Sequence, residues 1–194
     1  LKEKNFIITC CVNNTPVNKK FFNTLLKIAK DQDAQLLVIP ILYKNPSAMH
    51  SSEDVSWDSV IEPYSINKDL VLNKNILISN SKIQATAVNP LSGMEMIGGV
   101  SSVIFGHPQV ALKMVATPKH DIPKMITTTG TISANVFSGT KAGKKAETYN
   151  SVGGFFVKVK GDLFWKTELF WDDLGVSYLD KYYVNDEIRK QNVE

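Results

Sequence analysis

Uninterrupted apolar segments flank an amphipathic one near the start of the chain. Residues 5–12 (NFIITCCV) and 34–43 (AQLLVIPILY) are apolar runs rich in β-branched side chains, a pattern typical of strands covered on both faces. Between them, Thr15 and Pro16 suit the N-cap and first position of a helix. Apolar side chains then recur at helical spacing, at Phe21, Phe22, Leu25, Ile28 and Ala29. The pattern predicts a βαβ unit with parallel strands and a right-handed connection.

Shorter apolar segments follow a polar, proline-marked connection over 44–66, in which a short helix is expected near 53–60. The following apolar segments predict one strand over 75–90, or two joined by a turn at Asn80–Ser81, and further strands around Ile104, at 111–117 and at 123–129. Residues 153–184 alternate in polarity on both sides of a turn at 161–162, which predicts an antiparallel meander. We therefore expect a single α/β domain: a parallel βαβ unit at the N-terminus, a mixed sheet, and an antiparallel, β-rich C-terminal half.

Composition narrows the class of protein. The chain has 194 residues, 43% of them hydrophobic, and a net charge of +3, which fits one domain with a substantial core. No apolar run approaches the roughly 20 residues that cross a bilayer, so no membrane partner is expected. The adjacent Cys10 and Cys11 lie in an apolar run, which favours buried free thiols in a reducing compartment. The first residue is Leu, and the chain stops in a largely polar stretch, so we expect it to be a piece of a longer protein.

Motifs for catalysis are missing from the sequence. His50, His107 and His120 do not stand at metal-ligand spacing, and no CxxC pair is present. The sequence also contains no nucleophile elbow, phosphate-binding P-loop or dinucleotide fingerprint. It therefore predicts no metal site and no cofactor in this chain. Catalytic groups need only meet in space, so a triad of distant residues stays open, and the sequence identifies none.

A strip rich in lysine, glycine and hydroxyl side chains covers residues 127–147. Lys141, Lys144 and Lys145 surround Gly143. The hydroxyl groups nearby are those of Thr128, Thr129, Ser138 and Thr140. Glycine lets a backbone approach a phosphate closely, and lysine neutralises it. The alternative is a solvated loop whose lysines protect the neighbouring apolar strand from aggregation, and the residues alone leave both interpretations open.

Two weaker candidates accompany the strip. The Gly-His-Pro tripeptide at 106–108 places His107, with Lys113 nearby, at the end of a predicted strand that would face a ligand, although such tripeptides are usually plain turns. Aromatic side chains between 155 and 171 alternate with lysines, as in base-stacking platforms. Because alternation also places one set of these aromatics in the core, we interpret them as mostly structural.

Several segments carry a family resemblance between residues 13 and 147: NNTPVNKKFF, LLVIPILYKNP, IQATAVNPLSGMEMIG, SSVIFGHPQVALKMVATP, PKMITTTGTIS and SGTKAGKKAE. Together they resemble the amino-terminal region of early-expressed tailed-phage DNA nucleases that act in DNA transfer and host DNA degradation. In that family a calcineurin-like metallophosphoesterase domain follows, and its divalent metal ligands would lie beyond residue 194. The resemblance transfers no catalytic residue to this chain, and it favours the phosphate interpretation of the strip.

The combined expectation is a DNA-binding or assembly domain of a phage nuclease, working in the cytoplasm of the infected bacterial cell. Its partners would be DNA and, through assembly, a second copy or a host protein. One alternative is a protein–protein or oligomerisation module that uses the edge and aromatics of 163–171. The other is a stand-alone binder of a phosphorylated small molecule.

Overall fold

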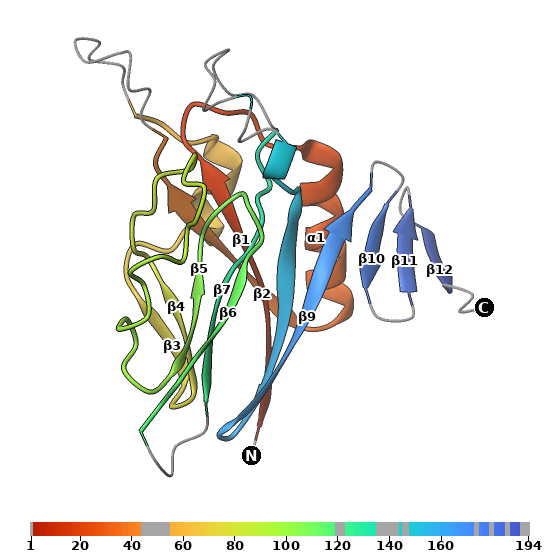
Figure 1. The fold of residues 1–194 in the computed structure, drawn as a ribbon. Coiled ribbons are helices and arrows are strands. Elements are labelled where there is room, and N and C mark those ends of the chain that lie inside the picture. The colour runs from red at the N-terminus through yellow and green to blue at the C-terminus, as the bar shows by residue number, and fades with distance from the viewer. Residues whose placement is uncertain are drawn as a thin grey trace.

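The computed structural model describes residues 2–43, 55–118, 123–134, 144, 148–172, 175–178, 181–184 and 187–190. Within these ranges the strands form two sheets (Figure 1). The first sheet runs in the order β12 (Glu187–Lys190), β11 (Lys181–Val184), β10 (Val176–Tyr178), β9 (Leu163–Trp171), β8 (Gly153–Lys160), β1 (Glu3–Val12), β2 (Ala34–Ile41). The second runs in the order β3 (Leu70–Asn73), β4 (Ile76–Ser79), β5 (Ser102–Phe105), β7 (Lys124–Thr128), β6 (Leu112–Val115).

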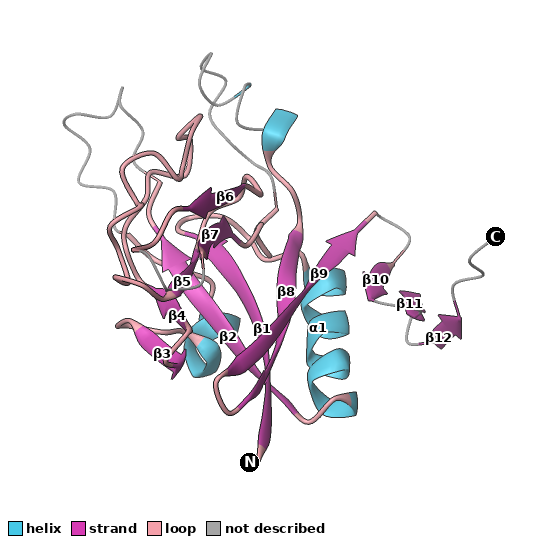
Figure 2. Ribbon diagram, turned by 60° about the horizontal axis from the view of Figure 1, so that its bottom comes forward, coloured by secondary structure: helices cyan, strands magenta, loops and turns pink. Residues whose placement is uncertain are grey.

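The predicted βαβ unit is confirmed. Strands β1 and β2 pair in parallel, and the helix α1 (Lys19–Asp31) that joins them lies against one face of their sheet (Figure 2). The buried side chains of α1 are the predicted ones: Phe21, Phe22, Leu25, Ile28 and Ala29.

The predicted start of this helix is wrong by three residues. The N-cap is Asn18, whose side-chain oxygen accepts a hydrogen bond from the Phe21 N–H at 3.1 Å. Val17 pairs with Ser133 in an antiparallel bridge, which keeps the chain extended past Pro16. A contact with a distant segment therefore overrides the local capping signal at Thr15.

The second sheet packs against the other face of the first. Ile8 of β1 and Phe155 of β8 share a buried cluster with Ile78 and Ile104 of the second sheet. Gly106 follows β5, and a Cβ at this position would lie 2.8 Å from Cγ2 of Ile39 in β2. The absence of a side chain there lets the two sheets approach closely.

The middle of the chain contains less strand than predicted. The strand expected over 75–90 ends at Ser79, and turns occupy most of the segment up to Ser101. These turns form an outer layer, in which Ile83 and Leu91 pack against Val103, Phe105 and Ile126. The expected short helix is the 3₁₀ helix η1, Ser59–Tyr64.

The predicted C-terminal meander is confirmed, and it extends the βαβ sheet because β8 pairs antiparallel with β1. The mixed α/β class, with parallel pairs early and antiparallel strands late, is therefore confirmed. No helix within the described ranges has the length and apolar character needed to cross a bilayer.

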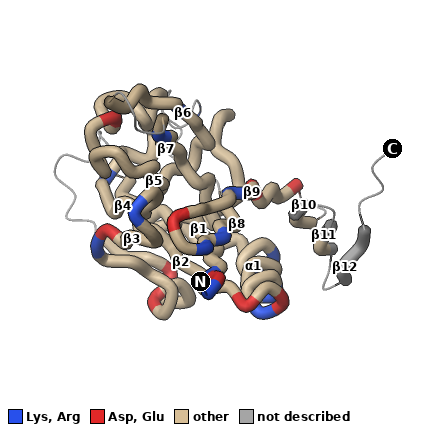
Figure 3. The backbone as a smooth tube through the Cα atoms, turned by 90° about the horizontal axis from the view of Figure 1, so that it is seen from below, with Lys and Arg blue, Asp and Glu red and all other residues tan. Residues whose placement is uncertain are grey.

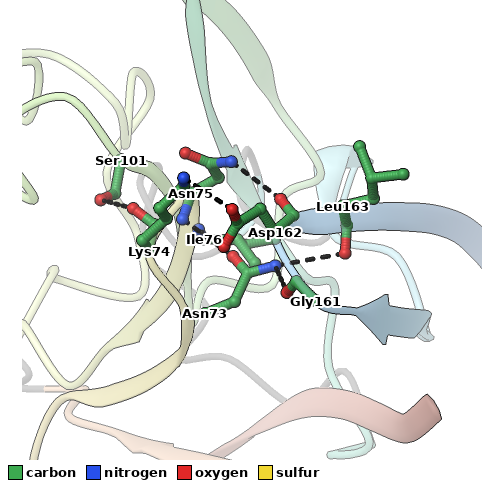
Figure 4. Close-up of polar contacts among 8 residues, drawn as sticks. All are labelled: Asn73, Lys74, Asn75, Ile76, Ser101, Gly161, Asp162 and Leu163. Carbon is green, nitrogen blue, oxygen red and sulfur yellow. Dashed lines mark hydrogen bonds and ion pairs between the residues drawn. The ribbon is translucent and has the colours of Figure 1, made fainter. Parts of the chain in front are cut away.

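Two hairpin turns, one from each sheet, are bound to each other (Figure 4). The Asn73 amide nitrogen donates to the carbonyls of Gly161 and Leu163 at 3.0 and 3.2 Å. The Asn75 amide nitrogen donates to the Asp162 carbonyl at 2.8 Å, and Lys74 forms an ion pair with the Asp162 carboxylate at 2.6 Å. These contacts connect the β3–β4 turn to the β8–β9 turn, and so link the two sheets.

Candidate anion-binding edge

The carboxyl ends of the parallel strands lie at one end of the molecule, opposite the N-terminus of the chain (Figure 1). In the first sheet these ends are Val12 and Ile41. In the second sheet β5 and β7 end at Phe105 and Thr128. We call this end of the molecule the carboxyl edge. Because open α/β sheets bind their ligands outside such an edge, it is the first candidate for a site.

Residues 129–134 cross from the second sheet to the first along the carboxyl edge. The Thr129 N–H donates to the Phe105 carbonyl, and the Ile132 N–H donates to the Cys10 carbonyl. Gly130 has a φ of +79°, and a Cβ there would lie 3.1 Å from the Ser151 carbonyl oxygen. Both constraints favour glycine, so the first part of the predicted strip is a structural crossing.

The threonines of this crossing are buried and hydrogen-bonded to the protein's own backbone. The Thr128 hydroxyl donates to the Gln109 carbonyl and accepts from the Ala111 N–H, both at 2.7 Å. The Thr129 hydroxyl donates to the Gly130 carbonyl at 2.7 Å. Thr128 and Thr129 are at most 1% exposed, so the prediction that their hydroxyls lie open to a phosphate is wrong. Short polar side chains replace ladder hydrogen bonds where the chain changes sheets.

His107 is also internal. It is 1% exposed, and its Nδ1 accepts from the Gln109 N–H at 3.0 Å. Its Nε2 lies 3.1 Å from the Gln84 carbonyl, so this nitrogen carries the proton and donates it. Burial lowers the pKa of His107 below its ordinary value. The imidazole is therefore a neutral bridge between loops, as in the turn interpretation, and does not face a ligand.

Lys113 is tied to a carboxylate. It lies opposite Ile126 in the β6–β7 pair and forms an ion pair with Glu95 of the outer layer. Among the described residues the Lys113 ammonium group has its ion pair with Glu95 and no hydrogen bond to the crossing or to His107. His107 adjoins the crossing, because the Gly130 N–H donates to the His107 carbonyl at 3.0 Å. Lys113 is held by Glu95 and does not complete a site with them.

The lysine-rich part of the strip lies largely outside the described residues, namely at Lys141, Gly143, Lys145, Ser138 and Thr140. Lys144 is described and exposed. The described residues on either side are held at the carboxyl edge. The Ala134 N–H donates to the Pro16 carbonyl at 2.8 Å, and Asn150 bridges Gln109. The chain therefore enters and leaves the lysine-rich segment at this edge.

The start of α1 lies directly beside the point where that segment begins. The Asn18 N–H donates to the Ile132 carbonyl at 2.8 Å. The first turn of α1 contains the exposed Lys19 and Lys20 and no acidic residue. The unpaired N–H groups and the dipole of a helix N-terminus attract anions. One carboxylate also lies here: Asp58 accepts from the Val17 N–H at 3.4 Å.

Sequence reasoning did not assign Lys19 and Lys20 to a site, because it placed the helix start at Pro16. The signal that could have found them is the pair of lysines in a first helical turn, where acidic residues are usually favoured.

The opposite end of the molecule differs in charge pattern. Seen from the N-terminal side, basic and acidic residues are intermixed (Figure 3). Lys158 pairs there with Glu3 at 2.9 Å, as Lys74 does with Asp162. Cations at that end are therefore partly neutralised by neighbours.

Neither thiol is a nucleophile in this environment. Cys10 and Cys11 are free and buried, as predicted. Burial raises the pKa of Cys10 to about 12 and that of Cys11 to about 11. A thiol must ionise to attack or to bind a metal, so both thiols are inert near neutral pH.

The divalent metal implied by the family resemblance finds no ligand set in the described part of the chain. No group of three or more His, Cys, Asp or Glu residues within it is placed to hold an ion. We therefore derive no metal-dependent step from these residues.

The fold and the carboxyl edge define a mixed α/β domain of two sheets with a candidate anion-binding edge. In sequence the chain is similar to protein A1 of Escherichia phage T5. The two are 28% identical over 184 residues, which cover 90% of this chain and 33% of that protein. The chain thus spans about one third of the length of the phage protein. No family model and no solved structure matches the chain. The comparison links the chain to a bacteriophage protein.

Proposed function

We propose that this chain is a DNA-binding domain of a bacteriophage DNA-processing protein, that it contacts backbone phosphates at its carboxyl edge, and that it carries no catalytic metal itself. The observation that carries the proposal is the anchoring of the lysine-rich segment beside the lysine-bearing start of α1. The similarity to a phage protein supports the part of the proposal that assigns this chain to a bacteriophage. The nuclease activity of a parent protein is part of the proposal, drawn from the family resemblance.

Electrostatics supports an anionic partner at this edge. Lys19 and Lys20 stand in the positive end of the helix dipole, where a cation costs the helix a few tenths of a kcal/mol. A bound phosphate offsets that cost, because it accepts from free helix N–H groups and pairs with the ammonium groups. Lys141, Lys144 and Lys145 follow in the sequence after Ala134, whose N–H is bonded to Pro16 at this edge.

Charge reversal tests the proposal. We expect Lys19→Glu/Lys20→Glu to weaken binding of a short labelled duplex, measured by fluorescence anisotropy across a salt series. We expect Lys141→Glu/Lys144→Glu/Lys145→Glu to abolish it. For B-DNA the slope of log K against log salt should fall by about 0.9 for each phosphate that a variant no longer neutralises.

The matched control is Lys2→Glu/Lys4→Glu, which reverses two exposed lysines at the opposite end of β1. Melting curves of all variants check that the fold is retained. The proposal would be refuted if duplex affinity did not change with salt concentration. It would also be refuted if the control lost as much affinity as the variants at Lys19 and Lys20 or in the lysine-rich segment.

A phosphorylated small molecule is the alternative ligand for the same donors. Melting the protein against a panel of nucleotides separates the two, because a ligand at 100 times its dissociation constant adds about 2.7 kcal/mol of stability. A large rise in melting temperature with a mononucleotide, together with no binding of the duplex, would favour a phosphorylated small molecule over DNA as the ligand.

A further inference from the structure

Strand β6 forms an edge of the second sheet, and among the described strands only β7 pairs with it. Edge strands present unpaired N–H and C=O groups, and proteins usually protect them with bulges, prolines or charges. The other edge of this sheet, β3, has a register shift between Val71 and Asn73. The edge strand β2 contains Pro40, and its Val38 carbonyl is occupied by the Ile66 N–H.

The register of the β6–β7 pair shows which backbone N–H and C=O groups of β6 point away from β7. The Thr128 N–H donates to the Ala111 carbonyl, and β6 continues antiparallel to β7 from this pair. Because hydrogen-bonded and non-hydrogen-bonded pairs alternate, Lys113 and Val115 direct their backbone groups toward β7. Leu112 and Met114 direct theirs outward. Within the described ranges, no loop or turn forms a backbone hydrogen bond with Leu112 or Met114.

The side chains of the same two residues are exposed, Leu112 by 59% and Met114 by 62%. Met114 lines a recess of about 210 Å³ beside the edge. The apolar part of its lining comes from both sheets: Val100, Met114, Pro123, Met125, Leu163 and Phe164. Open backbone groups and an apolar recess on one strand are the two requirements of strand addition, in which the backbone supplies affinity and the recess supplies selectivity.

The charge that would protect this edge is only partly available, because an exposed ion pair offsets some of it. Lys113 is the lysine within β6, and its ammonium group pairs with Glu95 on the face away from the recess. An antiparallel pairing of β6 with itself has two simple registers. Centred on Lys113, it would place like charges directly opposite, which is destabilising. Centred on Met114, it places Lys113 opposite the partner's Val115 and the two methionines together at the recess.

We propose that two copies of this chain associate through β6, antiparallel and with Met114 opposite the partner's Met114. The second sheet then continues across a twofold axis. The outward backbone N–H and C=O groups of Leu112 and Met114 form hydrogen bonds with β6 of the second copy. A closed twofold contact is the commonest symmetry of soluble oligomers. This association is independent of phosphate binding at the carboxyl edge.

Cross-linking tests the register. In a hydrogen-bonded antiparallel pair the Cα atoms lie about 5.5 Å apart, which suits a disulfide. We expect Met114→Cys to form a covalent dimer under oxidised glutathione, seen on a non-reducing gel. The natural thiols provide an internal control because both are buried. Val71→Cys is the matched control, since Val71 is 66% exposed on the other edge of the sheet.

Added charge tests the association itself. We expect Met114→Lys to reduce the mass measured by light scattering twofold, because two lysines would meet at the twofold axis. Val71→Lys should leave that mass unchanged. Wild-type protein that remains monomeric over a concentration series would overturn the proposal. So would cross-linking of Val71→Cys as fast as that of Met114→Cys, or a dimer that survives Met114→Lys.

Discussion

Small polar side chains hold the backbone of this protein together at positions where the sequence suggested a ligand. The Thr131 hydroxyl donates to the Cys10 carbonyl at 3.0 Å and accepts from the Ser133 N–H at 3.0 Å. The Ser133 hydroxyl in turn accepts from the Val12 N–H at 2.8 Å. A threonine side chain can replace a missing backbone partner or bind a phosphate, and only its neighbours decide between the two.

The buried thiols make stability depend on pH at this residue scale. The pKa of an unfolded cysteine is about 8.5, whereas folding raises it to about 12 for Cys10 and about 11 for Cys11. Between these values the unfolded chain releases protons that the folded chain keeps, so the free energy of unfolding falls as pH rises. Its slope should reach up to about 1.4 kcal/mol per pH unit for each thiol.

Urea unfolding of the wild type and of Cys10→Ala/Cys11→Ala from pH 8 to 11 measures this dependence. Lysines with lowered pKa values, such as Lys82, contribute equally to both proteins and cancel in the difference. We expect the wild type to lose stability more steeply than the variant above pH 9. Equal slopes of unfolding free energy against pH in the two proteins would contradict the raised pKa values of the two thiols.

At the scale of elements, the two bound hairpin turns show how the sheets keep their relative position (Figure 4). Asn73 uses both ends of its side chain. Its nitrogen donates across to the β8–β9 turn, and its oxygen accepts from the N–H groups of Asn75 and Ile76 at 2.8 and 3.0 Å. The amide group therefore shapes its own turn while it binds the other.

We expect Asn73→Ala to lower the free energy of unfolding by about 1–3 kcal/mol, because partly buried backbone groups lose their partners. Lys74→Ala removes an ion pair whose side chains are 67% and 61% exposed. Such pairs contribute about 0.2–1 kcal/mol and are screened by salt. Urea unfolding of both variants at low and high salt compares them, and an ion-pair variant that costs more than the amide variant would contradict this ranking.

At the scale of the whole molecule, the carboxyl edge and the β6 edge are separate surfaces, and different interactions drive binding at each. Phosphate contact depends on lysine charge at the start of α1, whereas self-association depends on backbone pairing and apolar burial along β6. We therefore expect the lysine-to-glutamate variants to keep the dimer mass, and Met114→Lys to keep its affinity for a duplex long enough for one copy only. Loss of both properties in either variant would show that the surfaces are coupled.

Local pattern predicted the regular elements well. The apolar face of α1, the parallel β1–β2 pair and the 153–171 hairpin follow from the periodicity of their side chains, because each buries one face or both. The outer layer over 80–101 was not predicted, since turns stacked on a sheet have no period. The helix start at Lys19 was missed because Val17 pairs with Ser133, which lies far away in the chain.

By itself the sequence determined the fold class, the buried face of the helix and the burial of the two thiols, because hydrophobic burial and strand or helix periodicity are local properties. Only the tertiary structure decided the roles of Thr128, Thr129 and His107. Their polar groups suit either a ligand or the protein's own backbone, and the packing of distant segments supplies the backbone partners. The tertiary structure likewise placed the start of the lysine-rich segment beside α1, since that proximity depends on how the chain crosses between its two sheets.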